Sequence, residues 1–418
     1  MSDTLIENAH LKHCEEAGEP AWLLDRRRSA WERSQDMPIP RFEKTDIRRW
    51  RLERATPGQH PDLDTRGIAP RSAEASIVTL NGRAARRNVS EALISMGIVL
   101  TDLEEAVRTM PDRIRPYLFS KDGPNDNLLT MLHRTYANGG VVLIVPSGVE
   151  VKEPIEIVQG FAASDAYPHT LVVLEPMARA TVVETLVSLD ESPITLNAQM
   201  EAHVADGGFL RYAGIQKLSH QVSMFHPRIV HLAKDAEVEW IVVEAGSRRV
   251  VTNNETMLEG DGSRSQSFAV FLLDGKTEME FQTSMFHGGR NSISDMDSKG
   301  VVKDSAKVAY TGFSSILRGA KGSETWQHEK TLMLSPDSRA DLIPMLMIDD
   351  EDVAKAGHAA AAGQVDEGQL YYLMSRGIPE REALLLLVMG FLGTILDRIP
   401  VPEVREEIQK LAERKVKG

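Results

Sequence analysis

Between residues 139 and 348, short runs of alternating apolar and polar residues follow one another with almost no helical periodicity. The run at 141–145 is rich in β-branched residues and leads through a Pro-Ser-Gly turn into another alternating run. Turn-forming triplets such as Asp206-Gly207-Gly208 and Asp261-Gly262-Ser263 separate later runs, several at intervals of roughly 28 residues. This spacing indicates an imperfect coil repeat.

Eight segments show the strand pattern most clearly. We expect strands at 170–174, 180–187, 209–213, 238–244, 267–273, 278–285, 307–313 and 330–334.

The pattern is compatible with a β-sandwich or with stacked parallel coils. A sandwich usually shows tight hairpins and strict alternation, whereas stacked coils show short strands, small polar corners and loose periodicity. The second description suits this chain better, so we favour a mainly β fold with a right-handed parallel β-helix core. The ends of such a core have to be capped. We therefore expect an N-terminal helical region at 1–135, the core at 136–360 and a C-terminal helical domain at 361–418.

The flanking segments carry helix signals. We expect helices at 21–33 and 93–110, with several prolines breaking the chain between them. A third helix should span 366–376, because acidic residues fill its first turn and Arg376-Gly377 suits its end. After Pro379, the segment 383–396 is apolar on nearly all sides. It has about 14 residues without charge, fewer than the roughly 18 that span a bilayer, so we expect a covered helix and no membrane span.

Composition restricts the possible partners. The 418-residue chain is 42% hydrophobic and 26% charged, as expected for a folded globular protein. A net charge of -13 argues against nucleic acid as the main partner. No signal-peptide pattern is present at the N-terminus, so we expect a cytoplasmic protein. Cys14 is the only cysteine, which excludes a multi-cysteine metal or iron–sulfur site made by this chain alone.

The strongest candidate for chemistry is His358. It follows the acidic run Asp349 to Asp352 and is flanked by Gly357 and a row of alanines. A lone histidine near carboxylates is more often hydrogen-bonded or solvated than a metal ligand. His287 and His328 lie beside aromatic residues without metal-ligand spacing, so we interpret both as structural. No P-loop, dinucleotide-binding or hydrolase motif occurs, so we expect a non-catalytic chain that binds no nucleotide.

A longer motif surrounds this histidine. It comprises Asp352-Val353, Lys355, Gly357-His358, Ala360, Gly363, Asp366-Glu367, Gln369-Leu370, Tyr372-Leu373 and Ser375-Arg376-Gly377-Ile378. This pattern resembles the signature of the SufB/SufD family of the Suf iron–sulfur cluster assembly machinery, whose members are said to share a helix-capped β-helix core. The segment from Phe42 to Trp50 is similar to an N-terminal element of SufD-like proteins.

Two departures from the SufB pattern favour a SufD-like chain. By alignment through Pro344, Ser338 takes the place of a SufB cysteine, and Ala359 that of a carboxylate after the histidine. Ala356 stands where some SufD sequences carry a thiol.

The resemblance implies a scaffold role. The chain would pair with a SufB-like paralogue through the β-helix core, and His358 would join the partner's cysteine and carboxylates around a transient, shared iron–sulfur cluster. Its C-terminal helices would dock on a SufC-like ABC ATPase. The implied contact residues are Tyr371, Tyr372, Leu373, Arg376, Leu385 and Phe391.

The isolated chain could also form a homodimer. Two alternative functions remain open at this point. One is a SufB-type homodimeric scaffold. The other is a carbohydrate-active β-helix enzyme, for which Asp349 to Asp352 is the only candidate carboxylate cluster.

Overall fold

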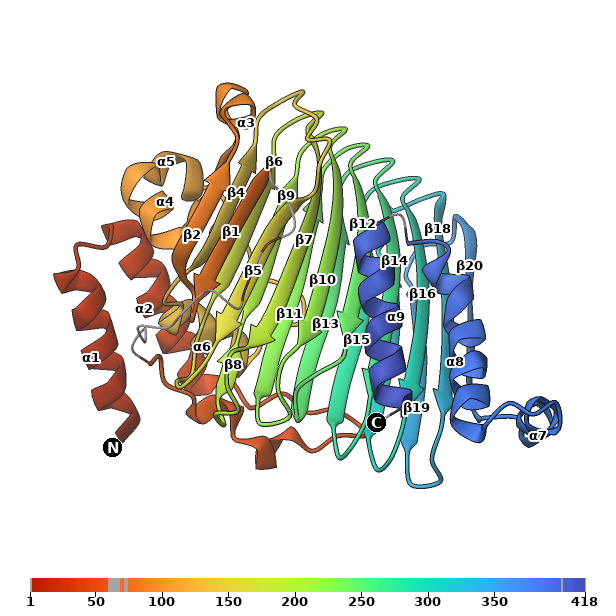
Figure 1. The fold of residues 1–418 in the computed structure, drawn as a ribbon. Helices are drawn as coiled ribbons and strands as arrows, with labels where there is room; N and C mark the ends of the chain where they lie inside the picture. Colours follow the sequence, from red (N-terminus) through yellow and green to blue (C-terminus); the bar gives the residue numbers. More distant parts are fainter. Residues whose placement is uncertain (1, 59–67, 69, 71–73, 400, 418) are drawn as a thin grey trace.

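The core of the computed structural model is a parallel β-solenoid built from two ten-stranded sheets that face each other (Figure 1). The structure describes residues 2–58, 68, 70, 74–399 and 401–417. Successive strands alternate between the sheets, and most pair in parallel with the equivalent strand of the next turn, giving about eight turns. The predicted helix-flanked parallel β-helix core is confirmed.

The two sheets are named here sheet A and sheet B. Sheet A comprises, in spatial order, β2 (Arg83–Val89), β1 (Ala75–Leu80), β5 (Ile155–Phe161), β7 (Arg179–Ser188), β10 (Phe209–Lys217), β12 (Glu237–Glu244), β14 (Arg264–Leu273), β16 (Ile293–Val302), β18 (Ser323–Met333) and β20 (Val353–Gln364). Sheet B comprises β19 (Arg339–Ile348), β17 (Lys307–Ile316), β15 (Glu278–His287), β13 (Arg249–Leu258), β11 (Ser223–Leu232), β9 (Gln199–Val204), β6 (His169–Leu174), β4 (Gly140–Val145) and β3 (Val99–Asp102), with β8 (Thr195–Asn197) paired to β11.

The coil repeat is visible in the strand register. Arg249 pairs with Glu278 and Glu278 with Lys307, so these turns advance by 29 residues. Inward side chains from both sheets stack into one hydrophobic core, in which Trp240 is fully buried. The corners need left-handed backbone: Gly207 has φ 65° and Gly262 has φ 74°, which glycine adopts without steric cost. The turn triplets in the sequence therefore mark the corners of the coils.

The N-terminal end of the solenoid is covered. Strands β2 and β3 pair antiparallel with β1 and β4, and helices lie around them. The N-terminal helices are α1 (Ser2–Glu16), α2 (Ala21–Asp36), α3 (Glu91–Ser95), α4 (Leu103–Thr109), α5 (Pro111–Ile114) and α6 (Leu128–Tyr136), with short 3₁₀ turns η1 (Ile47–Trp50) and η2 (Leu52–Arg54).

The prediction of one helix at 93–110 was wrong. Helix α3 ends before Gly97, which has φ 82°, and β3 then pairs with β4 before α4 begins. Two further strands, β1 and β2, also lie in the region expected to be helical. Pairing with the solenoid outweighs the local helix pattern here.

The C-terminal turn of the solenoid has no such cover. Each of β19 and β20 pairs with the preceding turn on one side only, so they form what we call the open end. Met345, Met347 and Ile348 on β19 are 46%, 51% and 45% exposed.

The chain then forms three C-terminal helices, α7 (Glu367–Ser375), α8 (Glu380–Leu396) and α9 (Pro402–Lys417). Asp366 caps α7 by accepting hydrogen bonds from the amides of Gly368 and Gln369, so the predicted helix at 366–376 is confirmed. Helices α8 and α9 pack on the outer face of sheet A in a second hydrophobic cluster, whereas α7 projects beyond the open end (Figure 1). In the described part of the chain, no helix has the length and apolarity that a membrane span requires.

Candidate functional site

The strand β20 carries His358 at its centre. Its partner on β18 is Gln327, and the inward residues of β18 are the odd-numbered ones, which are buried. Because neighbouring parallel strands in register point equivalent side chains to the same side, His358 faces the interior of the solenoid at its open end. The ring is exposed, and no hydrogen bond or ion pair within the described residues involves it.

Only glycine fits at position 357, directly before this histidine, for a steric reason. A Cβ at Gly357 would collide with the ring of Trp326 on β18, which lies against the strand. Lys355 places its Nζ 4.8 Å from the centre of the same ring. The outer face of β20 is therefore held by packing against Trp326, which leaves His358 in place on the inner face.

The acidic run before β20 forms a turn. Asp350 accepts hydrogen bonds from the amides of Gly319 (2.7 Å) and Asp352 (2.9 Å). These amide contacts hold the pKa of Asp350 below its usual range. Its carboxylate thus caps the corner between β19 and β20.

The positions compared above with the SufB and SufD patterns lie in the same region. Ser338, just before β19, donates its hydroxyl to the carbonyl of Ser335 at 2.6 Å. Ala356 and Ala359 both lie on β20. In the part of the chain that the structure describes, no group of three or more His, Cys, Asp or Glu side chains could hold a metal ion. Among the described residues, His358 therefore belongs to no cluster of three such side chains.

His287 and Cys14 occupy structural positions. His287 is buried and bonds Ser292 and Ser294 at 2.8 and 2.9 Å, and burial lowers its pKa to about 4. Cys14 lies 3.5 Å from the His10 ring, and burial raises the pKa of its thiol. It belongs to α1, at the opposite end of the molecule from β20 (Figure 1).

The predicted ATPase-contact residues fall into two groups. Tyr371 and Tyr372 on α7 are 74% and 56% exposed, and Arg376 stacks on Tyr372 with 5.1 Å between the guanidinium carbon and the ring centre. Leu373 is partly exposed, whereas Leu385 and Phe391 on α8 pack partly against the cluster on sheet A. The neighbouring Leu386 is 54% exposed.

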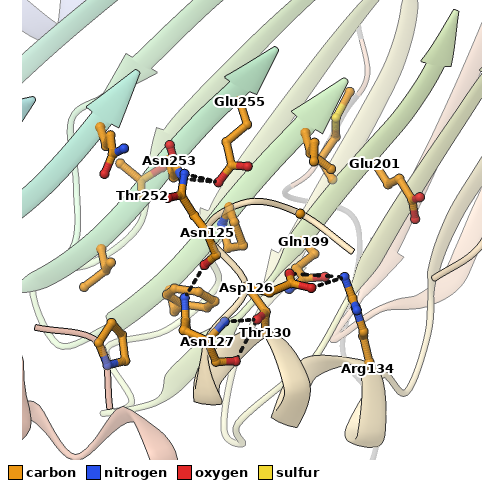
Figure 2. Close-up of a pocket in the computed structure, with 18 of the residues that line it drawn as sticks. Asn125, Asp126, Asn127, Thr130, Arg134, Gln199, Glu201, Thr252, Asn253 and Glu255 are labelled. Carbon is orange, nitrogen blue, oxygen red and sulfur yellow. Dashed lines mark hydrogen bonds and ion pairs between the residues drawn. The ribbon is translucent and has the colours of Figure 1, made fainter. Parts of the chain in front are cut away.

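A second candidate, which sequence reasoning missed, lies on the outer face of sheet B. Figure 2 shows a cavity of about 290 Å³ between β13 and the loop before α6. Glu255 accepts hydrogen bonds from Asn125 (2.9 Å) and Asn253, and burial raises its pKa to about 7. This carboxyl can exchange a proton near neutral pH. The only signal in the sequence was the polar triplet at 253–255 inside an expected coil.

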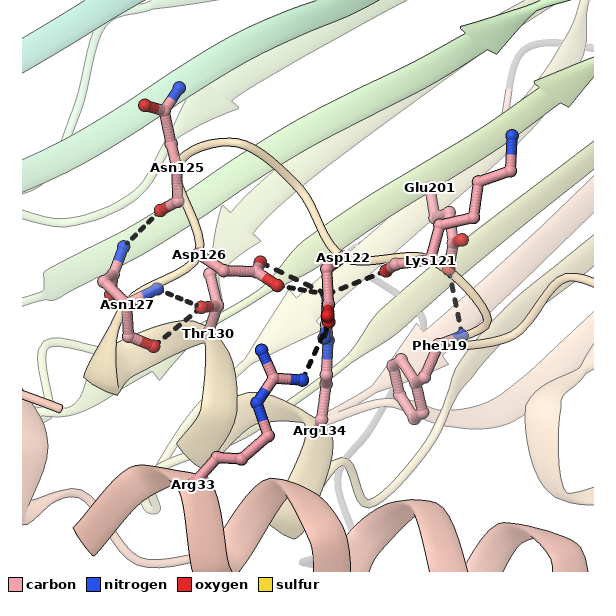
Figure 3. A network of polar contacts seen from close by, with 10 residues as sticks. All are labelled: Arg33, Phe119, Lys121, Asp122, Asn125, Asp126, Asn127, Thr130, Arg134 and Glu201. Atoms are coloured by element: carbon pink, nitrogen blue, oxygen red, sulfur yellow. Dashed lines mark hydrogen bonds and ion pairs between the residues drawn. The ribbon is translucent and has the colours of Figure 1, made fainter. Parts of the chain in front are cut away.

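Ion pairs fix the loop that covers this cavity. Asp122 contacts Arg33 on α2 at 2.8 Å and Arg134 on α6 at 2.9 Å, and Arg134 also contacts Asp126 at 3.0 Å (Figure 3). The amide of Phe119 donates to Glu201 on β9 at 3.3 Å. The network therefore attaches the N-terminal cover to sheet B.

Comparison with known proteins adds to this geometry. Residues 157–391 match the model of the SUF system FeS cluster assembly, SufBD core domain, and residues 69–157 match the SufBD protein N-terminal region. The chain is 33% identical to the iron–sulfur cluster assembly protein SufD of Bacillus subtilis (strain 168), over 99% of this chain and 98% of that protein. It is 27% identical to SufB of the same organism, over 96% and 90% of the two chains. A SufBD family protein of Staphylococcus epidermidis (strain ATCC 12228 / FDA PCI 1200) is 26% identical over 99% and 93%.

Proposed function

Because this chain belongs to the SufB/SufD family of iron–sulfur cluster assembly proteins, we propose that it is the SufD-like half of a paired scaffold. It pairs with a SufB-like paralogue through the open end of its solenoid and contributes His358 to a site where a nascent cluster is built as cargo. A SufC-like ATPase docks on its C-terminal helices. The single observation that carries the proposal is the inward-facing, unpartnered His358 on an uncovered end strand.

The open end has the properties of a partner surface. The free edges of β19 and β20 present unpaired backbone groups, and exposed side chains such as Met345 and Met347 surround them. Natural proteins protect long free edges unless another chain covers them. A second solenoid of similar shape can extend both sheets by strand pairing.

The cluster needs ligands from two chains. Imidazole is a borderline ligand that suits iron, and iron–sulfur clusters are otherwise held mainly by cysteine thiolates. This chain has one thiol, and it lies in α1, far from β20. A pair of two such chains would bring two histidines and no thiolate to the open ends, which favours a thiol-bearing paralogue over a homodimeric scaffold.

The exposed side chains of the C-terminal helices support the proposed ATPase contact. Helix α7 has no buried residue, and its aromatic side chains together with Leu386 on α8 form an exposed apolar surface beyond the solenoid. Tyrosine and arginine are enriched at protein contacts. Leu385 and Phe391 contribute mainly by holding α8 on sheet A.

The experiment is co-expression of this chain with its SufB-like and SufC-like partners, followed by size-exclusion chromatography and anaerobic cluster reconstitution. We expect a stable complex in which His358→Ala lowers the cluster yield at least tenfold without changing assembly. His220→Ala, which removes another exposed histidine, is the matched control and should leave the yield unchanged. Normal yield from the His358→Ala complex would remove His358 from the site.

A second arm of the experiment tests the docking surface. Leu386→Asp places a charge on the exposed side of α8 and should abolish ATPase binding in a pull-down, whereas Ile94→Asp, at a 59% exposed position near the covered end, should not. ATPase binding that survives Leu386→Asp would place the docking surface elsewhere.

A further inference from the structure

One turn below the open end, strand β18 directs four polar side chains into the solenoid. Thr325, Gln327, Glu329 and Thr331 are each at most 3% exposed. Their register partners on β20 are Ala356, His358, Ala360 and Ala362. Three of these four partners are alanines, so little side-chain volume lies between the polar row and the open end.

Several atoms of this row lack a partner. Within the described part of the chain, both oxygens of Glu329, Oε1 of Gln327 and the hydroxyl of Thr331 are buried without a hydrogen bond. The orientation of the Gln327 amide is determined by its contacts: its Nε2 donates to Ser314 Oγ (2.9 Å) and to the carbonyl of Met345 (3.1 Å), which can only accept. The amide oxygen Oε1 of Gln327 therefore points away from Ser314 and Met345.

The orphaned oxygens converge on one point. A Cβ added to Gly312 of the facing strand β17 would collide with Glu329 Oε1 and come within 3.2 Å of Gln327 Oε1. Because Gly312 has no side chain, the carboxyl group of Glu329 lies against its Cα, with the amide oxygen of Gln327 close by. His358 lies on the next rung, about 4.8 Å from Gln327 at the backbone.

Other buried carboxylates inside the same solenoid have partners. Glu244 pairs with the buried Arg228 at 2.9 Å, and Glu184 accepts hydrogen bonds from Tyr212 and Thr170. No ion pair of the described residues involves Glu329. The backbone amide of Gly312 lies near the carboxyl group of Glu329 without forming a hydrogen bond of ordinary geometry. A buried carboxylate without a cation is costly, so a bound cation would remove a penalty that the fold otherwise carries.

We propose that Glu329 and Gln327 form a binding site for a divalent first-row transition-metal ion inside the last complete turn, with His358 as the ligand nearest the open end. Carboxylate, amide oxygen and imidazole together suit Fe²⁺ and Mn²⁺ better than soft metals. The site belongs to a single chain. It goes beyond the proposed function, because it requires neither a paralogue nor a cluster.

The test uses the full chain alone under anaerobic conditions. Binding of Mn²⁺ is followed by electron paramagnetic resonance and binding of Fe²⁺ by equilibrium dialysis, and the shift of the melting temperature with each metal is recorded. We expect one saturable ion per chain and a raised melting temperature. Glu329→Gln should weaken binding at least tenfold, and Gly312→Ala should do the same because its Cβ displaces the Glu329 carboxylate without removing a ligand.

Glu280→Gln is the matched control. Glu280 is a buried carboxyl on sheet B whose pKa burial raises to about 7, so the variant removes a similar group outside the site and should bind metal like the wild type. Absence of saturable binding to the wild type would overturn the proposal and favour a neutral Glu329 that donates to Gln327. Equal binding by the wild type and Glu329→Gln would overturn it as well. Both results are independent of partner assembly, which size-exclusion chromatography of the same variants reports separately.

Discussion

The two ends of the solenoid solve the same problem in different ways. Strand β2 at the N-terminal end is also an edge strand, but Arg83, Arg86 and Arg87 charge it, and it lies beside β3 and the N-terminal helices. Strand β20 at the open end has no charged residue from 356 to 364 and is exposed along most of its length. Charges on an edge prevent pairing with other chains. The edge strand at the N-terminal end is therefore protected against pairing with another chain, whereas the edge strand at the open end remains available for a partner.

The interiors of the two halves differ in the same direction. In the middle of the solenoid, Arg228 and Glu244 neutralise each other within a network that includes Thr252 and Asn254. Near the open end, Glu329 is buried without a cation among the described residues. The buried carboxylate in the middle of the solenoid thus has a cationic partner, whereas the one next to the open end has none among the described residues.

The largest expected effect concerns this internal contrast. Arg228→Met should lower the free energy of unfolding by about 3–5 kcal/mol, because it leaves the Glu244 carboxylate buried without its cation. Glu329→Gln should cause no loss in the absence of metal, because no cation partner is removed. Urea denaturation of both variants measures the difference. Equal destabilisation by the two substitutions would show that Glu329 has a structural partner. It would contradict the difference between the middle of the solenoid and the open end.

The next effect concerns the covered half and depends on pH. Burial raises the pKa of Glu255 to about 7, whereas an unfolded glutamate titrates near ~4.3. The stability contributed by the protonated carboxyl is therefore complete below about pH 4 and is lost as the pH rises through 7. Glu255→Gln keeps an oxygen for Asn125 and Asn253 and should raise the unfolding free energy by about 3 kcal/mol at pH 8.

At pH 4 the same variant should match the wild type, since both side chains are then neutral. Denaturant titrations at pH 4, 6 and 8 test this, with Glu150→Gln at an exposed position as the control. A gain that is independent of pH would contradict a raised pKa for Glu255.

A smaller effect tests the surfaces of the two ends directly. Met96 and Met347 are both 51% exposed, one near the covered end and one on β19. Met347→Asp should weaken association with the SufB-like paralogue about 100-fold, or about 2.7 kcal/mol, while Met96→Asp should leave it unchanged. Calorimetric titration and thermal melting of both variants separate a binding effect from a folding effect. Equal weakening by the two substitutions would show that the ends are not distinguished.

The coil architecture could be predicted from the sequence because turn triplets and β-branched runs repeat along it. The sequence did not predict strands that carry a row of polar side chains on one face. β13 contains Asn253, Asn254 and Glu255, and β16 contains Asp295 and Asp297, which hide the alternation of apolar residues. The antiparallel strands β2 and β3 depend on pairing with distant segments, which local periodicity does not report.

The candidate site was predictable only in part. The motif around His358 drew attention to that residue, and the helix starting at Asp366 followed from its capping signals. That His358 faces inward depends on its register with Gln327, and the position of the Glu329 carboxyl group depends on Gly312 of the other sheet. Both relations join residues on different strands, so no local pattern contains them.

The central claim is that the open end receives the partner, and hydrogen–deuterium exchange tests it most directly. The chain should be measured alone and in complex with its SufB-like paralogue. We predict that amides at 339–364 exchange rapidly in the free chain and become protected in the complex, while those at 83–89 do not change. Protection at 83–89, or a stable complex without protection at 339–364, would contradict the account.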